Sequence, residues 1–385
     1  MKFISYHLLT PYRGALLNRD DAGFAKTIPV GSTVRTRVSS QCIKYHLRNH
    51  EGPGAIRDAG DMSIRSRQTF RKKIAEPLAK HHSTAVAAAV TAYLKEKVLD
   101  DAPGVEDVLE SDDPMSEFEE DGAPKVLGSQ EVSYLRDVAA DLIETAGEDP
   151  SEDDIEEAAE NHSNNHPTLE ADLVANLEAL SNAIGIDGAM FGRMVTSDVL
   201  SRVNSAVHVA HAHTVQEQQR ESDYFTAIDQ LKDGSGSAHN GSKELTSGLY
   251  YQFMVIDTSL LRENLGDPSL AEEVVRRFTS AVARVSIGAK KGSTAPYSLP
   301  IAMLVKAHNV QPFDLHEAFV PAVEENGEGV YQRSAQKLFD WRQKVNEAFG
   351  TGDSEYRYVA PVDVDTDLES ARLLELAEWT SNQIS

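Results

Sequence analysis

The chain has 385 residues, with 61 acidic and 37 basic side chains and a formal net charge of −24. This length allows two or more domains, and a hydrophobic content of 41% is typical of a globular protein. No run approaches the ~18 apolar residues that a membrane-spanning helix needs, and no signal-peptide core precedes the first strand pattern. We therefore expect a cytoplasmic protein with no membrane partner. The single cysteine, Cys42, excludes a disulfide or a thiolate metal cluster within one chain.

The negative charge is concentrated in one segment. Residues 100–180 hold 26 Asp and Glu against 2 Lys and Arg, a balance of 2 − 26 = −24. Residues 1–80 hold 15 Lys and Arg against 6 Asp and Glu, a balance of 15 − 6 = +9. Because screening at physiological salt limits charge interactions to ~8 Å, a polyanionic partner responds to local charge rather than to the total. The amino-terminal part can therefore face a polyanion.

Four segments rich in Val, Ile, Tyr and Phe have the pattern of β-strands: 2–9, 205–215, 247–258 and 300–308. Helical patterns follow the first of them at 39–50 and the third at 269–285. The resulting order is β, α, β, β, α, β, which a ferredoxin-like sheet with two helices on one face requires. RNA-recognition domains share this architecture. We therefore predict an α+β fold built on an RRM-like domain.

A long interruption at about 57–185 separates the first predicted helix from the second predicted strand. Its pattern is mostly helical, and acidic runs separate the helices. The predicted helices of this part are 63–76, 83–98, 130–146 and 168–184. We expect a helical subdomain inserted into the sheet domain. A helix-rich portion at 312–348 and a helix at 367–381 complete the predicted chain.

The stretch "VRTRVSSQCIKYHLRNH" at 34–50 gathers basic side chains at a predicted helix start. Ser39 or Ser40 can accept hydrogen bonds from the free N–H groups there, and Lys44 and Arg48, four residues apart, share a face. Together with Arg35 and Arg37 just upstream, the helix start can bind a phosphate, because its N–H groups and the guanidinium groups all favour an anion. A solvated basic face on an ordinary helix explains the same spacing equally well.

The loop "LNRDDAGFAKT" at 17–27 adds Arg19 and Lys26 after the first strand. Asp20 and Asp21 are typical of a turn, and a second reading makes the loop another contact with a nucleic-acid backbone. A third reading has the carboxylates hold a divalent metal for phosphodiester cleavage. One adjacent pair supplies no third ligand, so we predict neither a metal site nor a catalytic residue.

Further along, Met194 follows Arg193 in "AMFGRMVTSD", and it is either core filler or a wedge between bases with Arg193 on the adjoining phosphate. In "SDYFTAIDQLKDGSGSAHNG" at 222–241, the Gly-Ser centre predicts a hairpin or loop, and its aromatic residues can stack on bases or pack in the core. His211 and His213 are expected on one face of a strand and His208 on the other. No cofactor motif occurs in the sequence.

Seven colinear motifs resemble the CasC (Cas-seven) family, the backbone subunit of the type I-E CRISPR Cascade complex. These motifs are "LNRDD", "RVSSQCIKYHLR", "GRMVTSD", "AVHVAHAHTV", "DYFTAIDQL", "GSAH" and "TSGLYYQF". The resemblance is close over 1–50 and 188–260 and holds only in outline elsewhere. It implies an RRM-like palm, helical fingers and a β-hairpin thumb. The implied parts are palm at 1–56, 186–217 and 246–360, fingers at 57–185, thumb at 218–245 and a carboxyl-terminal helix at 361–385.

In this family, copies of the subunit polymerise in a helical filament along crRNA, flip out nucleotides at regular intervals and present the guide to target DNA. The implied partners are therefore crRNA, further copies of the chain, target DNA through the guide, and the large, small and crRNA-end-binding Cascade subunits. The implied RNA-binding residues are Arg19, Lys26, Arg37, Ser39, Ser40, Gln41, Lys44, Arg48, Arg193 and Met194. The implied thumb residues near the bases are Phe225, His239 and Asn240. Tyr45 and Asn240 depart from the residues that the family commonly has.

The resemblance predicts a scaffold that is not an enzyme and that binds RNA through phosphates without reading sequence. Two other functions stay open. The chain can be a metal-dependent ribonuclease that uses Asp20 or Asp21, by analogy with type III backbone subunits. It can also be a protein-binding module whose acidic segment mimics nucleic acid.

Overall fold

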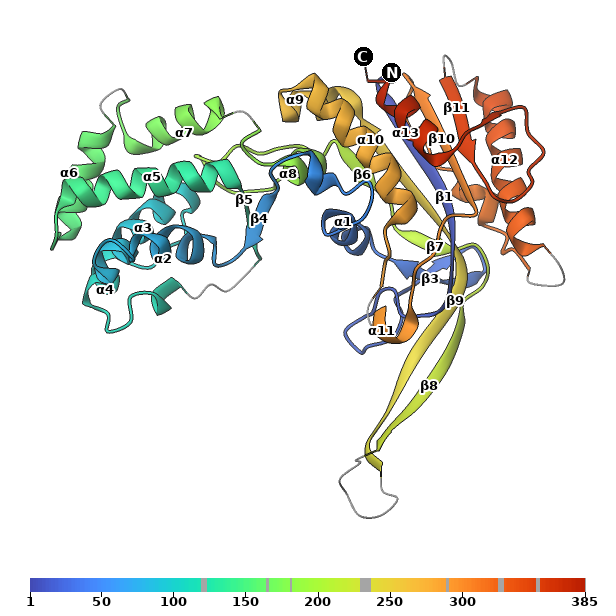
Figure 1. The fold of residues 1–385 in the computed structure, drawn as a ribbon, viewed down its shortest axis with the longest axis horizontal. Helices are drawn as coiled ribbons and strands as arrows, with labels where there is room; N and C mark the ends of the chain where they lie inside the picture. The colour runs from blue at the N-terminus through green and yellow to red at the C-terminus, as the bar shows by residue number, and fades with distance from the viewer. Residues whose placement is uncertain are drawn as a thin grey trace. The chain divides into compact units, whose positions relative to one another are not determined.

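The computed structural model describes residues 1–118, 123–163, 166–180, 182–228, 237–288, 291–324, 329–350 and 354–384. The chain divides into two compact units. The first unit comprises Met1–Ala59, Val207–Ser259 and Ser269–Ser385, and the second comprises Gly60–Ala206 and Leu260–Pro268. The sequence predicted an insertion at 57–185 and palm from 186 onward. In the structure the second unit extends to Ala206, so residues 186–206 belong to it and not to the sheet unit. The fold is α+β, as the sequence predicts (Figure 1).

The first unit is built on an antiparallel sheet in which β1 (Phe3–Ala15) lies between β10 (Ala302–His308) and β9 (Ser237–Asp257). On its other side β9 pairs with β6 (Val207–Val209) and β7 (Ala212–Thr214). The central order is therefore β10-β1-β9-β7. With the two helices that follow β1 and β9, this confirms the predicted β, α, β, β, α, β succession.

Shorter strands extend both ends of this sheet. At one end β11 (Ser354–Val359) pairs with β10, and β12 (Glu369–Ser370) runs parallel to β11. At the other end β3 (Thr33–Val38) pairs with β7 and with β2 (Thr27–Val30). Pro29 lies in the edge strand β2. Proline has no N–H to donate, and an edge strand tolerates this because it has only one neighbour to pair with.

Helices cover both faces of the sheet. On one face Tyr6 of β1 contacts α10 (Pro268–Arg284), where its hydroxyl lies 2.9 Å from Thr279 Oγ1. Thr279 in turn bonds Thr380 of α13 (Leu373–Ser381) at 2.8 Å. The neighbouring strand residues point the other way, so that Leu9 joins the apolar cluster under α12 (Val330–Phe349).

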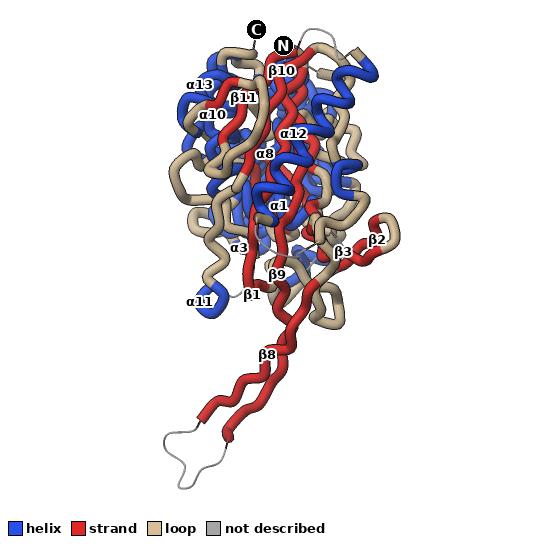
Figure 2. Tube along the Cα trace, turned by 90° about the vertical axis from the view of Figure 1, so that its right-hand side faces the viewer, coloured by secondary structure: helices blue, strands red, loops and turns tan. Residues whose placement is uncertain are grey.

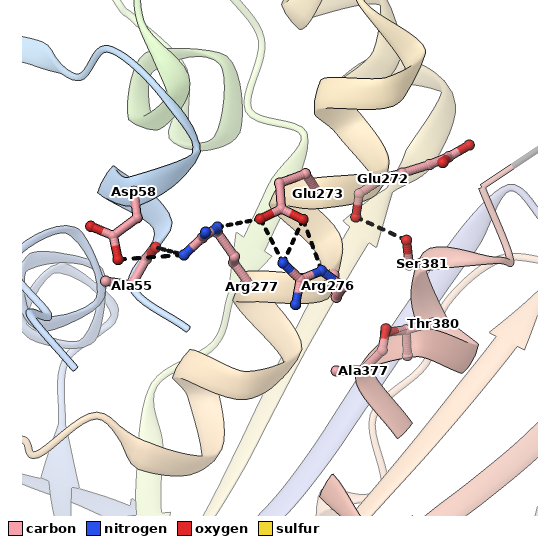
Figure 3. Close-up of polar contacts among 9 residues, drawn as sticks. All are labelled: Ala55, Asp58, Glu272, Glu273, Arg276, Arg277, Ala377, Thr380 and Ser381. Atoms are coloured by element: carbon pink, nitrogen blue, oxygen red, sulfur yellow. Dashed lines mark hydrogen bonds and ion pairs between the residues drawn. The ribbon is translucent and has the colours of Figure 1, made fainter. Parts of the chain in front are cut away.

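Polar contacts hold α10 to the neighbouring segments of the first unit (Figure 3). Arg277 Nη1 donates to the carbonyl oxygen of Ala55 at 3.2 Å, and its Nε bonds Glu273 on the same helix. Ser381 Oγ donates to the carbonyl oxygen of Glu272 at 3.1 Å, which fixes the end of α13. Gly54 permits this packing, because a Cβ there would lie 2.5 Å from the Cβ of Ser280.

A long hairpin extends from the sheet (Figures 1 and 2). It consists of β8 (Gln219–Ile228) and the first half of β9, and the pairing runs from Gln219 opposite Ser247 to Ile228 opposite Ser237. This is the thumb hairpin predicted at 218–245, and the Gly-Ser centre of its tip lies outside the described residues.

The second unit packs its helices around α3 (Thr84–Leu99), which is apolar on nearly every side. Such a helix is stable only when neighbours cover it all round. The neighbours include α5 (Ser129–Ala146) and a π-helical turn at Arg71–Ala75. The other α-helices of this unit, among the described residues, are α2 (Glu76–Leu78), α4 (Val105–Glu110), α6 (Glu152–His162), α7 (Leu169–Ala179), α8 (Ile186–Phe191) and most of α9 (Thr258–Leu265).

The helix predicted at 63–76 is wrong at its start. Residues Ser63–Ser66 form β4, which pairs with β5 (Lys125–Gly128). A strand this short depends on a partner far along the chain, which periodicity cannot reveal. Likewise α7 ends at Ala179, before the predicted 184. Among the described residues, no helix has the length and hydropathy needed to cross a membrane.

Candidate nucleic-acid interface

The start of α1 (Ser40–Arg48) is fixed by its own sequence. Ser39 is the N-cap, and its Oγ accepts from Cys42 N at 3.3 Å. Ser39 N donates to Asn18 Oδ1 at 2.9 Å, which ties the helix start to the loop after β1. Ile43 and Leu47, four residues apart, are fully buried. The opposite side of the helix is therefore available to solvent.

Basic groups gather around this helix start. Ser40 N donates to Nδ1 of the exposed His211 at 3.0 Å. Partial burial lowers the pKa of His211, and the positive charges of Arg37 and Lys26 lower it further. A lowered pKa favours the neutral imidazole, whose Nδ1 can accept the bond from Ser40 N. Lys26 and Arg37 are also joined through their backbones, since Arg37 N donates to the carbonyl oxygen of Lys26 at 2.7 Å.

The Nε of Arg37, near the start of α1, has no hydrogen-bond partner among the described residues. The Arg37 side chain is half-buried, and its Nε is enclosed by the protein. A buried unpaired donor is costly, by about 1–3 kcal/mol, unless a ligand accepts from it. The charge of Lys26 acts on the same region, where it partly offsets the rise that burial causes in the pKa of Cys42. The structure thus brings Lys26, Arg37, Ser39 and Ser40 together, as predicted.

Other predicted residues lie on the same elements. Arg19 is exposed in the loop before β2, and Gln41 is exposed in the first turn of α1. Lys44 and Arg48 are half-buried further along the helix. Beside them Tyr45 is 57% exposed and offers an aromatic face. We call the surface formed by these elements the α1 surface, which comprises Arg19, Lys26, Arg37, Ser39, Ser40, Gln41, Lys44, Tyr45, Arg48 and His211.

Asp20 behaves as a turn residue. Asp20 Oδ1 accepts from Phe24 N at 2.9 Å, and the Asp20 carbonyl oxygen accepts from Gly23 N at 3.1 Å. Within the described residues, no group of three or more His, Cys, Asp or Glu side chains is arranged to bind a metal.

Arg35 corrects the prediction that it contributes to a phosphate site. The side chain is fully buried, and its guanidinium group donates to the carbonyl oxygens of Thr214 at 3.2 Å and Phe319 at 3.1 Å. Its Nε donates to Thr33 Oγ1 at 2.8 Å. The segment around residue 319 covers this side of β3, so Arg35 joins protein segments and does not face a ligand.

Arg193 is a second correction. It lies in the second unit, and both partners of its ion pair with Glu131 have side chains that are 2% exposed. Its guanidinium group also donates to the carbonyl oxygen of Ser201 at 2.9 Å. These protein oxygens occupy the donors that a phosphate would need. The adjacent Met194 is 98% exposed and therefore is not core filler.

The hairpin presents aromatic side chains midway along its paired strands. Lys243 Nζ lies 4.0 Å from the ring centre of Phe225, while Tyr224 is 64% exposed. A Cβ at Gly241 would lie 2.4 Å from Phe225 Cζ, so only glycine at position 241 leaves room for the ring in this position. Asn240 is exposed, and the side chain of His239 lies outside the described residues.

Two features were missed in the sequence. His211 and His213 were expected on one face of a strand, but the chain leaves the sheet between β6 and β7, so His211 is exposed and His213 is buried against His316. A hollow of about 540 Å³ also lies between the loop after β1 and the root of the hairpin, with Arg19 and Arg220 in its lining. No local signal in the sequence indicates either feature, since both depend on where distant segments meet.

Comparison with known proteins agrees with the predicted resemblance. The family model described as "CT1975-like protein" matches residues 4–381, so the chain belongs to that family. A solved chain of a "CRISPR RNA-guided surveillance complex, pre-nicking" is similar with 23% identity, a TM-score of 0.79 and full coverage of both chains. A chain of a "CRISPR RNA-guided surveillance complex" has 21% identity and a TM-score of 0.69, over 98% of this chain and 99% of that one. The curated proteins include no match.

These matches establish the fold over essentially the whole chain. With the family model, they confirm the resemblance to the CasC (Cas-seven) family. The structural identities are low, so they concern the fold, and the role of individual residues has to be argued from the geometry above.

Proposed function

We propose that the chain is a non-catalytic backbone subunit of a type I-E CRISPR Cascade complex. In this role copies of the chain bind the phosphate backbone of crRNA side by side, and they present the guide for pairing with target DNA. The large, small and crRNA-end-binding subunits of the complex are its further partners. The fold shared with chains of CRISPR RNA-guided surveillance complexes supports this role.

The observation that carries the proposal is the α1 surface. The side chain of Lys26 and the unpaired Nε of Arg37 lie there beside the start of α1, where His211 accepts from Ser40 N. Such donors favour an anion, and a surface that binds phosphates is tolerant of base sequence. A guide holder needs this tolerance because the sequence is read by the RNA itself.

The test is the binding of purified chain to RNAs of unrelated sequence. We expect Lys26→Ala combined with Arg37→Ala to weaken binding to all of them alike. Each lost phosphate contact on a single strand changes the slope of log affinity against log salt by ~0.7, so the slope should become shallower by about 1.4. Lys337→Ala combined with Lys344→Ala, two exposed positions on α12, removes the same charge elsewhere and serves as the control. Unchanged affinity and slope in the double variant at the α1 surface would overturn the proposal.

The non-catalytic part of the proposal has its own test. Assembled protein is incubated with RNA complementary to the guide and with Mg²⁺. We expect no cleavage of that RNA. Cleavage that is lost on Asp20→Ala or Asp21→Ala would show instead a metal-dependent ribonuclease.

A further inference from the structure

A basic patch lies in the otherwise acidic second unit. Between residues 63 and 82 the chain has six Lys and Arg and a single acid, Glu76. We call this the basic segment, comprising Arg65, Arg67, Arg71, Lys72, Lys73 and Lys80. It begins in β4, continues through the π-helical turn and ends just after α2. The α1 surface belongs to the other unit, so the proposed RNA site leaves this segment unexplained.

Apolar side chains of this segment are buried, and its lysines are exposed to solvent. Phe70, Ile74 and Leu78 are buried in the apolar cluster of the second unit, and this anchors the backbone. Lys73 and Lys80 are exposed, and their amino groups make no hydrogen bond or ion pair with any residue that the structure describes. The basic segment therefore presents positive charge to solvent from a rigid base.

An acidic face lies elsewhere on the same unit. From 129 to 162 the chain holds twelve Asp and Glu against one Arg. On α6, Ile155, Ala158 and Ala159 are buried, so the acidic residues between them point outward. We define the acidic face by its exposed residues Asp141, Glu144, Asp153, Glu156, Glu157 and Glu160.

These two charged surfaces lie on different sides of α5. The helix packs against α6 and also against the π-helical turn of the basic segment. In Figure 1 α6 lies at the left-hand end of α5, and α2 lies below α5. A molecule with complementary surfaces on different sides associates head to tail, which produces an open filament rather than a closed dimer.

We infer that the basic segment of one copy binds the acidic face of the next copy along the RNA. This inference rests on the proposed function, because it concerns copies that lie side by side on a strand. Each copy carries a net charge of −24, so neighbouring copies repel one another unless charges of opposite sign meet locally. Complementary charge at a contact also fixes register and suppresses wrong partners.

Nucleic acid is the competing occupant of the basic segment. The acidic face gives every copy a surface of opposite charge to this segment, and this favours a second copy. Within the segment Glu76 already bonds Lys72 Nζ at 2.6 Å and Arg71 Nε at 3.2 Å, so the contact is assigned to Lys73 and Lys80.

The test uses charge reversal and its rescue. K73E/K80E places acids opposite the acidic face, and D153K/E157K places lysines on that face, where the two positions lie four residues apart on α6. Combining all four substitutions swaps the charges and keeps the net charge at −24. K337E/K344E on α12 of the first unit is the matched control. Native mass spectrometry counts the copies on a long RNA, and a short RNA that holds one copy measures RNA affinity separately.

We expect each reversal alone to weaken the association of neighbouring copies roughly tenfold and the four-substitution chain to restore it. Affinity for the short RNA should stay as in the wild type, as should both readouts in the α12 control. Failure of the four-substitution chain to restore assembly, or K73E/K80E weakening binding to the short RNA, would overturn the inference and favour nucleic acid. If the wild-type chain binds no RNA, the proposed function fails. The contact between the basic segment and the acidic face is then tested without RNA, by measuring self-association in sedimentation at low and high salt.

Discussion

The buried ion pair between Arg193 and Glu131 is the sharpest test of how the second unit is built. Arg193 Nη1 donates to both carboxylate oxygens of Glu131, at 2.9 and 2.7 Å, and both side chains are 2% exposed. We expect Glu131→Ala to lower the free energy of unfolding by about 3–5 kcal/mol, because it leaves the guanidinium charge buried without a counter-ion. It also removes the acceptor of Gly128 N, at 2.7 Å, which adds ~1 kcal/mol through the lost helix cap.

The assay separates the two units. Both tryptophans, Trp341 and Trp379, lie in the first unit, whereas helical circular dichroism reports strongly on the second. Glu131→Ala should shift the dichroism transition to a lower urea concentration. The tryptophan fluorescence at that urea concentration should stay at its folded value, because the first unit is still folded. Removing both partners together should cost less than the sum of the single changes, since the two charges are coupled.

Two results would refute this reasoning. The first is a dichroism transition of Glu131→Ala within about 1 kcal/mol of the wild type, since a buried charge that loses its partner costs more than that. The second is a loss of RNA affinity in Arg193→Ala without any loss of stability, which would return Arg193 to the RNA-binding residues.

Three further outcomes follow from the packing. Gly128→Ala should destabilise the second unit by about 1–3 kcal/mol in the same dichroism assay, since its Cβ would lie 1.6 Å from the Ala183 carbonyl oxygen. Burial lowers the pKa of His213 and of His308 to about 4, so both are neutral in the folded first unit. As pH falls from 6.5 toward 4, the unfolded chain binds protons that the folded chain does not, and the free energy of unfolding decreases. Urea unfolding followed by tryptophan fluorescence should show a loss of about 2 kcal/mol per histidine at pH 5. Burial lowers the pKa of Lys306 to about 8, and its Nζ has no hydrogen-bond partner among the described residues, although it lies 4.5 Å from the ring centre of Phe313. Lys306→Met removes the cost of the buried charge and also this cation–π attraction, so it should raise the unfolding free energy at pH 7 by about 1 kcal/mol, and a lower value than that of the wild type would contradict this.

Much of the fold of the first unit was predictable because its signals are local. Alternation over four segments and helical spacing over two predict the order of elements, and the structure has that order. Ser39 or Ser40 was expected to cap a helix start from residue type and position, and Ser39 is the N-cap of α1. The failures have a common cause. Ser63–Ser66 is a strand only because Lys125–Gly128 lies beside it, and no pattern within four residues reveals such a partner.

The sequence by itself determined the segregation of charge, the succession of strands and helices, and the basic composition of the α1 surface, because each depends on residues close together in the chain. Only the tertiary structure decided which basic side chains face solvent. Arg35 is buried by carbonyl oxygens 179 and 284 residues away, and Arg193 by a carboxylate 62 residues away. A guanidinium group binds whichever oxygens the folded chain places around it, so equal side chains in similar motifs serve the interior at one position and a ligand at another.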